Sequence, residues 1–435
     1  MKRVVGIDGH NLALPRGTGV ATYAKNLADN IGGLGWQTCT LYGAPLSSDL
    51  PPSLREISFF DYLGGASPKK GKFNAAYSYI KESIAAPLGY SAINIPVTGN
   101  VEARRFSGRL PKESEIFNIE NLFHVARRHF QRHRKFLAVR FSNPPDLMHW
   151  TYPLPIRVLD IPNIYTIHDL VPLRLPYTTL DNKRYYHRLI KGCLDVADHI
   201  CTVSDKSKAD IIQLFGTNEQ RITNTYQAVE IGQAESAKSL QDAELEVEGI
   251  YGLEPKNYFL FLGAIEPKKN VGRLIEAFLS VRLDAKLVIV GSLAWKSDEE
   301  MKLFTSMLKQ RPELGKRIHV FDYAPRPFLI SLIRSAKAVV FPSLYEGFGL
   351  PILEAMQLGT PTLSSTEGSL PEIAGGASLS VDPYDVASIA HGLRILDSDQ
   401  GVRTELSSAG LLRAKVFNSA NYRSRLHLMY QNRFL

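Results

Sequence analysis

The chain has 435 residues, of which 44% are hydrophobic and 22% charged, and it carries a formal net charge of +8. This length exceeds what one ordinary hydrophobic core holds, so two domains are expected. No apolar run approaches the roughly 18 residues of a membrane-spanning helix, and Asp8 and His10 interrupt the apolar start that a signal peptide would need. The three cysteines lack metal-ligand spacing and fit a reducing cytosol better than a disulfide framework.

The N-terminal stretch predicts the start of a doubly wound α/β domain. Val4–Asp8 is a short apolar run typical of a buried strand, and Val20–Ile31 has the periodicity of an amphipathic helix. Between them lies a turn that contains Gly17 and Gly19. A strand, a glycine loop and a helix in this order occur in nucleotide-binding domains, but two glycines alone also fit a plain tight turn, and both interpretations stay open.

Residues 45–145 form a long insertion whose pattern is hard to interpret. Prolines, glycines and a lysine cluster at Lys69–Lys72 suggest loops around 51–72, and Phe73–Ala86 and Ile119–Phe136 have helix-like patterns. Such an insertion can cover a site or dock on a surface. The basic segment Arg127–Arg140 is either a solvated helix face or an anion-binding patch. Because no zinc-finger, RNA-binding or helix-turn-helix pattern is present, nucleic acid is not expected as a partner.

Strand patterns return after the insertion. Asp146–Trp150, Asn163–Ile167, His199–Ser204 and Ile222–Tyr226 are expected strands. His168 and Asp169 directly follow the second of these, at the carboxyl end of a strand, where open α/β sheets bind ligands. We therefore favour a functional role for His168 over a structural one.

The polar, acidic stretch 232–250 is taken as the domain boundary, and a second α/β series follows it. Its expected strands are Tyr258–Leu262, Lys286–Val290, Ile318–Phe321, Ala338–Phe341, Thr362–Leu363 and Leu379–Val381. Its expected helices are Val271–Val281, Glu299–Gln310, Phe328–Ser335, Pro351–Leu358 and Tyr384–Leu396. Strict strand–helix alternation predicts a parallel sheet with right-handed crossovers. Asn418–Asn432 predicts a final helix.

Two stretches of the second half carry charge at strand ends. Lys268 and Lys269 follow the first strand, and Asn270 is expected to cap the helix from Val271. Glu346 and Glu354 flank a glycine-containing turn between a strand and a helix. A helix N-terminus with nearby lysines favours a phosphate, and Glu354 could accept hydrogen bonds from a ribose diol. We interpret this as a site for a nucleoside diphosphate in a cleft between the two domains.

No Asp-rich or His-rich cluster accompanies these positions. Protein cations, rather than a metal ion, are therefore expected to neutralise the diphosphate. A Walker A loop is also absent, which argues against a P-loop NTPase.

These motifs together resemble glycosyltransferase family 4, whose members are retaining enzymes of the GT-B fold and include bacterial mannosyltransferases. The resemblance rests on GAIEPKKN at 263–270, FPSLYEGFGLPILEAMQLGTP at 341–361, SLPEIAGGA at 369–377 and VDP at 381–383. RGTGVATY at 16–23, TIHDL at 166–170 and TVSDKSK at 202–208 extend it to the first half. It implies two Rossmann-like doubly wound domains that face a cleft: residues 1–235 for the acceptor, residues 236–417 for the donor, and a final helix, 418–435, that packs back on the first domain.

The resemblance also implies roles for single residues. Glu354 would bind the donor ribose, Glu346 would lie near the hydroxyls of the transferred sugar, and His168 would contact that sugar from the other domain. Lys269, with help from Lys268, would bind the phosphate. The backbone of Phe348, Gly349 and Leu350 would meet the sugar and phosphate, and Gly17 and Gly19 would let the N-terminal loop approach them.

Two positions depart from the family pattern, because many relatives have arginine where this chain has Ala264 and Lys268. Lysine provides a point charge rather than a bidentate fork, so phosphate binding is expected to depend mainly on Lys269.

The implied reaction is retaining transfer of a hexose, without a metal or another cofactor, from a nucleotide sugar to a hydroxyl of a growing glycan. GDP-mannose is the favoured donor, and a lipid-linked surface polysaccharide such as O-antigen is the expected acceptor. The protein would act in the cytoplasm, at the inner face of the plasma membrane if its basic segment binds anionic lipid. The alternative is a non-catalytic scaffold or partner subunit of the same fold in a polysaccharide assembly complex. An epimerase or a phosphorylase of similar fold is a more distant possibility.

Overall fold

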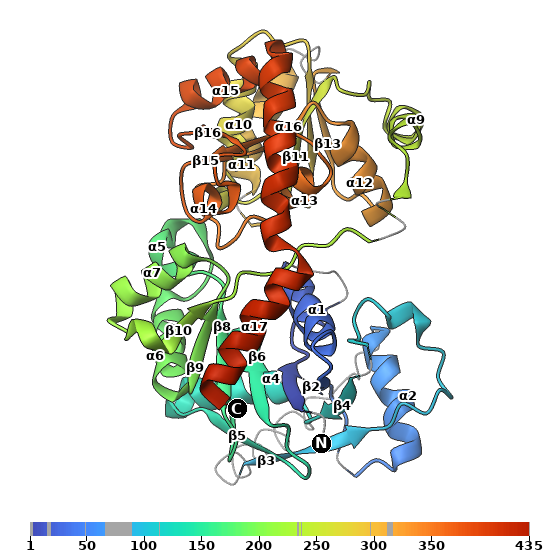
Figure 1. Cartoon of the computed structure of the whole chain (residues 1–435), viewed down its shortest axis with the longest axis vertical. Helices are drawn as coiled ribbons and strands as arrows, with labels where there is room; N and C mark the ends of the chain where they lie inside the picture. The colour runs from blue at the N-terminus through green and yellow to red at the C-terminus, as the bar shows by residue number, and fades with distance from the viewer. Residues whose placement is uncertain are drawn as a thin grey trace.

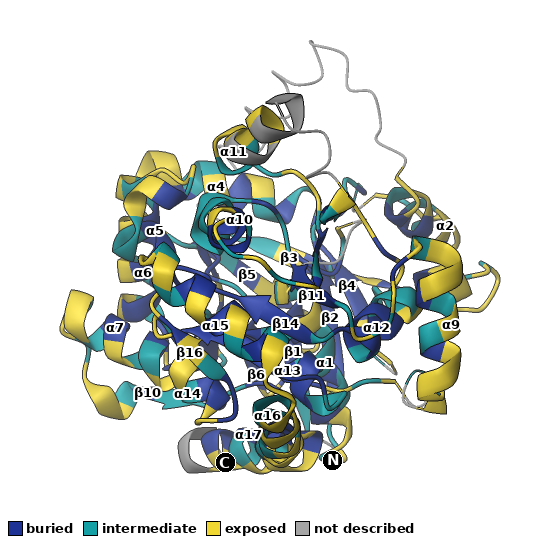
Figure 2. Ribbon diagram, turned by 90° about the horizontal axis from the view of Figure 1, so that it is seen from above, coloured by how far each residue is buried: buried dark blue, intermediate teal, exposed yellow. Residues whose placement is uncertain are grey.

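The computed structural model describes residues 3–14, 19–47, 49–65, 89–112, 114–232, 235, 237–295, 297–310 and 316–434. Figure 1 shows two lobes, each built around one sheet, with the last helix running from one lobe onto the other. Seen from above in Figure 2, the strands are mostly buried, and exposed residues lie on the outer faces of the helices. We call the two parts the N-terminal lobe and the C-terminal lobe. The boundaries proposed from the sequence stay predictions.

The sheet of the N-terminal lobe has, among the described residues, ten strands in the order β10-β9-β8-β6-β1-β2-β4-β3-β5-β7. They are β1 (Val4–Asp8), β2 (Gln37–Tyr42), β3 (Tyr90–Ile95), β4 (Glu115–Asn118), β5 (Leu137–Phe141), β6 (Leu147–Trp150), β7 (Ile156–Val158), β8 (Asn163–Ile167), β9 (His199–Thr202) and β10 (Ile222–Asn224). The sheet is mixed, because β3 runs antiparallel to β4.

The helices of this lobe are α1 (Gly19–Gly32), α2 (Pro52–Leu63), α4 (Leu122–His133), α5 (Val171–Arg174), α6 (Lys183–Val196) and α7 (Asp205–Phe215). The loops predicted around Pro51, Pro52, Gly64 and Gly65 flank an unpredicted helix, α2, and of these positions only Pro52 lies inside it. Pro52 stands in its first turn, where a missing N–H costs nothing, and Phe59 and Phe60 bury its inner face. The expected helix Phe73–Ala86 and the lysines of 69–72 lie outside the described residues.

The sheet of the C-terminal lobe has, in the part of the chain described, six strands in the order β13-β12-β11-β14-β15-β16, all parallel. They are β11 (Tyr258–Leu262), β12 (Lys286–Val290), β13 (Ile318–Phe321), β14 (Ala338–Phe341), β15 (Thr362–Ser365) and β16 (Leu379–Val381). The predicted parallel sheet is confirmed. Its order reverses between β11 and β14, and ligands of doubly wound folds bind at such a switch point.

Helices of the C-terminal lobe are α9 (Leu240–Tyr251), α10 (Val271–Leu279), α11 (Ser297–Gln310), α12 (Arg326–Ser335), α13 (Leu350–Gln357), α14 (Leu370–Ala374), α15 (Val386–Ser398) and α16 (Gln400–Ala414). The stretch 232–250, expected as a boundary, therefore contains most of α9. The Lys238 Nζ lies 2.7 Å from Oε2 of Glu246, and the hydroxyl of Ser331 in α12 donates to the same oxygen at 2.7 Å. These contacts hold this part of the chain to α12.

The final helix, α17 (Ser419–Phe434), packs on the N-terminal lobe. The Tyr430 hydroxyl lies 2.6 Å from Nδ1 of His149, a fully buried residue of β6, and Nε2 of that ring lies 2.8 Å from the Thr166 hydroxyl. Burial lowers the pKa of His149 to about 3, so its imidazole is neutral at pH 7. Neutral hydrogen bonds therefore attach the end of the chain to the first lobe.

Candidate functional site

An ion pair between Lys269 and Glu346 lies where the C-terminal sheet reverses its order. Lys269 ends the short 3-10 turn η5 (Pro267–Lys269) that follows β11, and Glu346 follows β14. The Lys269 Nζ lies 2.6 Å from Oε1 of Glu346, and 4.7 Å from the ring centre of Phe341. Only 14% of the lysine side chain and 12% of the glutamate side chain are exposed. The structure thus brings together two residues that lie 77 positions apart in the sequence.

The electrostatics around this pair favour the charged forms. Burial alone would raise the pKa of Glu346, but the charges of Lys269 and Lys268 lower it below its usual value. Burial alone would likewise lower the pKa of Lys268, yet the charges of Glu346, Asp169 and Glu266 raise it. Lys268 also lies 3.5 Å from Glu266. Lys268 and Glu346 are therefore held in their charged forms, next to Lys269, at the carboxyl ends of β11 and β14. This composition suits a phosphate next to a polyol.

Asn270 does not cap helix α10 as predicted. It occupies the N-cap position but with a left-handed backbone, φ 63°, and its side chain makes no capping hydrogen bond. Its amide nitrogen instead donates to the carbonyls of Pro342 and Pro383, at 3.0 and 2.7 Å. Asn270 thus ties the lysine-bearing turn to the loop that carries Glu346.

The loop after β14 is shaped by two glycines with different functions. A Cβ on Gly347 would lie 2.5 Å from the carbonyl oxygen of His168, so only glycine permits this approach of the two lobes. Gly349 has φ +113°, a conformation that other residues rarely adopt, and it is the N-cap of helix α13. Phe348 between them is buried. In the described part of the chain, the N–H groups of Phe348, Gly349 and Leu350 have no hydrogen-bond acceptor from the protein. They are free for an anion at this helix N-terminus.

Ser369 holds the same loop from behind. Its hydroxyl donates to the carbonyls of Phe348 and Glu346, at 2.9 and 3.0 Å, and its N–H donates to the Glu346 carbonyl at 3.1 Å. The carbonyl side of the loop is therefore occupied, which leaves the N–H side for a ligand.

Glu354 lies one turn into α13 and pairs with an arginine that the sequence analysis missed. Oε1 of Glu354 is 2.6 Å from an Nη atom of Arg326, whose Nε also lies 3.9 Å from Glu235. Burial raises the pKa of Glu354, and the charge of Arg326 opposes that rise. The only sequence signal for Arg326 is its position at a helix start after β13, and the contact itself depends on the tertiary fold.

His168 approaches this site through its backbone. Its Nε2 lies 2.8 Å from the Thr151 carbonyl, and its ring contacts Tyr23 edge-on at 4.8 Å. Burial lowers the pKa of His168, so the ring is neutral at pH 7. The predicted contact between its ring and a sugar stays a prediction.

The N-terminal helix of the first lobe also reaches the site. A Cβ on Gly19, the first residue of α1, would lie 3.7 Å from a methyl group of Leu350, the first residue of α13. The N-termini of the two helices therefore meet across the lobes. Gly17 lies outside the described residues.

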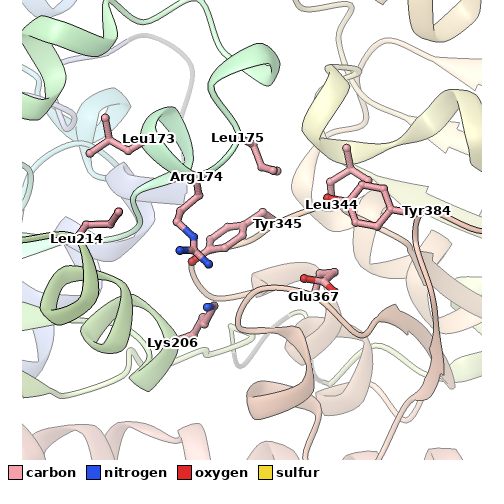
Figure 3. Close-up of a pocket in the computed structure, with 9 residues that line it drawn as sticks. All are labelled: Leu173, Arg174, Leu175, Lys206, Leu214, Leu344, Tyr345, Glu367 and Tyr384. Carbon is pink, nitrogen blue, oxygen red and sulfur yellow. The ribbon is translucent and has the colours of Figure 1, made fainter.

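Helix α7 of the N-terminal lobe makes further contacts with the C-terminal lobe. Glu372 of α14 accepts hydrogen bonds from the N–H groups of Asp205 and Lys206, at 2.7 and 3.1 Å, at the start of α7. The Tyr345 hydroxyl donates to Asp210, a buried residue of α7. A pocket of about 220 Å³ lies beside this contact, and Figure 3 shows the residues that line it. Its lining comes from both lobes and includes Arg174, Lys206, Glu367 and Tyr384.

Neither a metal-binding cluster nor a membrane span was found where the structure is described. There, no group of three or more His, Cys, Asp or Glu side chains could hold a metal ion. No helix within those residues is long and apolar enough to cross a membrane.

Comparisons with known proteins match both halves of the chain. The family model "Glycosyltransferase Family 4" matches residues 101–232, and "Glycosyl transferases group 1" matches residues 246–413. O-antigen chain mannosyltransferase B of Escherichia coli is 36% identical over 272 residues, which span 59% of this chain and 67% of that protein. The serotype-specific mannosyltransferase WbdA of Escherichia coli is 28% identical over 340 residues, 71% of this chain but only 40% of WbdA.

Solved structures show the same fold at low sequence identity. Sucrose-phosphate synthase from Thermosynechococcus elongatus superposes with a TM-score of 0.65 at 17% identity, over 99% of both chains. Anabaena Alr3699/HepE, solved in complex with UDP and glucose, has a TM-score of 0.65 at 14% identity and covers 99% of this chain and 100% of its own. WaaG, a glycosyltransferase involved in lipopolysaccharide biosynthesis, has a TM-score of 0.58 at 14% identity, over 98% of this chain and 99% of its own. The two-lobed arrangement is thus that of GT-B glycosyltransferases.

Proposed function

The chain belongs to glycosyltransferase family 4, and on that premise we propose that it transfers mannose, or a closely related hexose, from a nucleotide sugar to a hydroxyl of an O-antigen glycan. The observation that carries the proposal is the Lys269–Glu346 pair at the switch point of the C-terminal sheet. The mannosyltransferase names of its relatives support the sugar and the glycan.

Each residue of the site has a role in this reaction. Lys269, with Lys268 beside it, offsets the charge of the diphosphate as the sugar leaves. The free N–H groups of Phe348, Gly349 and Leu350 bind the phosphate or the sugar at the start of α13. Glu346 accepts hydrogen bonds from the sugar hydroxyls, and Glu354, oriented by Arg326, accepts from the ribose diol.

We further propose that the reaction retains the anomeric configuration and needs no metal. The acceptor hydroxyl would attack from the face that the phosphate leaves, and the departing phosphate oxygen would take its proton. Protein cations would then perform the charge neutralisation that Mg²⁺ provides elsewhere. GDP-mannose is the donor we favour.

A donor panel with product analysis tests the proposal. GDP, UDP and ADP are titrated by calorimetry, and each nucleotide sugar is incubated with an oligomannoside, with and without EDTA. We expect GDP to bind, EDTA to have no effect, and NMR to show an α-linked product from GDP-mannose. If no nucleotide binds at millimolar concentration, the transferase proposal fails and the non-catalytic scaffold becomes the better explanation.

Membrane contact is a separate part of the proposal. Helix α4 buries Leu122, Val125 and Phe130 in the lobe, whereas Arg127, Arg132 and Arg134 are exposed at its outer face and end. Such a face attracts anionic lipid by about 1 kcal/mol per basic residue. In flotation at low salt, vesicles that contain 30% phosphatidylglycerol should carry the protein upward. If flotation does not depend on the anionic lipid, the basic residues of α4 only form a solvated helix face.

A further inference from the structure

A cluster of polar side chains follows β1 and β6, the strands at which the N-terminal sheet reverses its order. β1 lies between β2 and β6, and both pairings are parallel. The carboxyl ends of β1 and β6 are thus the counterpart, in this lobe, of the ends of β11 and β14 that carry Lys269 and Glu346. Open α/β sheets bind ligands at such points. The residues concerned are Asp8, the last residue of β1, His10 and Asn11 shortly after it, and Thr151 and Tyr152 after β6.

Asp8 organises this cluster from inside. It is fully buried, and its carboxylate accepts hydrogen bonds from the N–H of Thr151 at 2.5 Å and from the N–H of His10 at 3.2 Å. The Thr151 carbonyl in turn faces the His168 ring, and the His168 carbonyl lies against Gly347. A continuous chain of contacts therefore connects Asp8 to the residue that follows Glu346.

Two polar atoms of the cluster have unused hydrogen-bonding capacity. Among the described residues, the His10 Nδ1 and the Asn11 Nδ2 are buried and have no protein partner. Only 8% of Asn11 is exposed. Because buried polar groups almost always have a hydrogen-bond partner, these atoms call for a polar ligand or ordered water.

Aromatic rings flank the same imidazole. Tyr152 lies nearly parallel to the His10 ring at 6.0 Å, and Phe123 contacts it edge-on at 4.8 Å. Burial raises the pKa of Tyr152 to about 12, and the charge of Lys268 in the other lobe opposes that rise. Lys268, which we propose helps to bind the phosphate, is therefore near Tyr152. Aromatic side chains with a few oriented polar groups are the usual lining of a small-molecule site. The cluster around His10 carries no net positive charge of its own.

We propose that this cluster binds the terminal pyranose of the acceptor glycan, with His10 and Asn11 hydrogen-bonding two of its hydroxyls. Asp8 is a positioning residue that fixes the backbone of His10 and Thr151. The inference rests on the proposed function, because it places the acceptor sugar opposite Glu346 and Lys268. The neutral hydrogen-bonding groups at the carboxyl ends of β1 and β6 suit hydroxyls, whereas the charged groups at the ends of β11 and β14 suit a diphosphate.

The variants H10Q and N11A test the proposal, and N11D serves as a second asparagine variant that keeps the side-chain shape. H124Q and N100A are matched controls at exposed positions of the same lobe. Kinetics use GDP-mannose as donor and octyl α-mannopyranoside as acceptor, GDP affinity is measured by calorimetry, and thermal unfolding confirms that each variant is folded. We expect H10Q and N11A to raise the acceptor KM at least tenfold, with a change of less than twofold in GDP affinity and in the controls.

Binding is also measured without turnover, by saturation-transfer NMR of methyl α-mannopyranoside with GDP present. We expect signal with the wild type and its loss in H10Q and N11A. An acceptor KM within twofold of the wild type, a mannoside signal that the variants retain, or an equal loss of GDP affinity would each overturn the inference. These outcomes differ from failure of the proposed function, in which the wild type binds no nucleotide.

Discussion

The two sheet switch points of this protein differ in their chemistry. At the ends of β11 and β14 the side chains are ionic, and Lys269, Glu346, Glu354 and Arg326 form two ion pairs. At the ends of β1 and β6 the available groups are a neutral imidazole and an amide around a buried carboxylate. The same topology therefore presents charge to one ligand and hydrogen bonds to the other. In the functions we propose, this difference separates the donor site from the acceptor site.

The largest effect is expected from K269M. It removes the hydrogen-bonded partner of the mostly buried Glu346 carboxylate and leaves only the charge of Lys268 near it, which costs about 3–5 kcal/mol of unfolding free energy. Urea denaturation at pH 7 measures the loss, and nucleotide binding should disappear with it. K112M, at an exposed lysine, is the control.

The double variant K269M/E346Q sharpens the test, because it removes the unpaired charge. Most of the stability should return, whereas transfer should not. If K269M costs less than 1 kcal/mol, the pair is not the buried electrostatic centre that distinguishes the C-terminal lobe.

The second effect concerns acid stability and the N-terminal lobe. His149 has a pKa of about 3 when folded and roughly 6.5 when unfolded. Below pH 6.5 the unfolded chain binds a proton that the folded chain does not, so stability falls as the pH falls. The loss attributable to His149 reaches about 3 kcal/mol at pH 4. Glu346, whose folded pKa is lowered, loses its contribution only as the pH falls below the usual carboxylate range.

The two lobes should therefore weaken in different pH windows. W295F leaves Trp36 and Trp150, both in the N-terminal lobe, as fluorescent reporters. Their unfolding should become easier between pH 6.5 and 4, and H149Q should flatten that dependence, whereas H391Q, an exposed control, should not. An unchanged slope in H149Q would remove His149 as the cause.

The same contrast explains how far the sequence predicts the molecule. The C-terminal strands were predicted almost residue by residue, because a parallel sheet buried on both faces produces continuous apolar runs separated by helices. The sequence could place Lys269 and Glu346 close together, because the carboxyl ends of all strands in a parallel sheet lie on the same side. Within residues 45–145, by contrast, α2, β3, β4 and β5 were missed. Their strands are partly exposed, and β3 pairs antiparallel with β4, so no continuous apolar run identifies them.

Contacts of single side chains were less predictable than strands. Arg326 at the start of α12 meets Glu354 of α13 across 28 positions of sequence, and Asn270 meets two proline carbonyls instead of its own helix. Asp8 and His10 were first regarded only as interruptions of an apolar run. The hydrogen bond between Asp8 and Thr151 spans 143 positions, and no local pattern shows it.

A third prediction separates nucleotide binding from acceptor binding. R326Q removes the charged partner of Glu354, so GDP affinity should fall by about 1.5–3 kcal/mol, or roughly 10- to 150-fold. The acceptor KM should stay within twofold, because Arg326 lies on the C-terminal side only. R394Q, at an exposed position of α15, is the control. A larger effect on the acceptor than on GDP would contradict the division of functions between the lobes.

The smallest effect tests the contact that belongs to both lobes. Glu372 caps α7 across the interface through two backbone N–H groups. E372Q removes a charge at a helix N-terminus, worth about 0.3–1 kcal/mol, and should shift the lobes toward separation. Because closure serves donor and acceptor alike, the KM values for both should rise together by about two- to fivefold, and small-angle scattering should show a larger radius of gyration with GDP. E405Q, exposed on α16, should change neither. A change in the KM of one substrate alone would show that Glu372 serves only the binding site for that substrate. The contact between the lobes would then not affect donor and acceptor binding together.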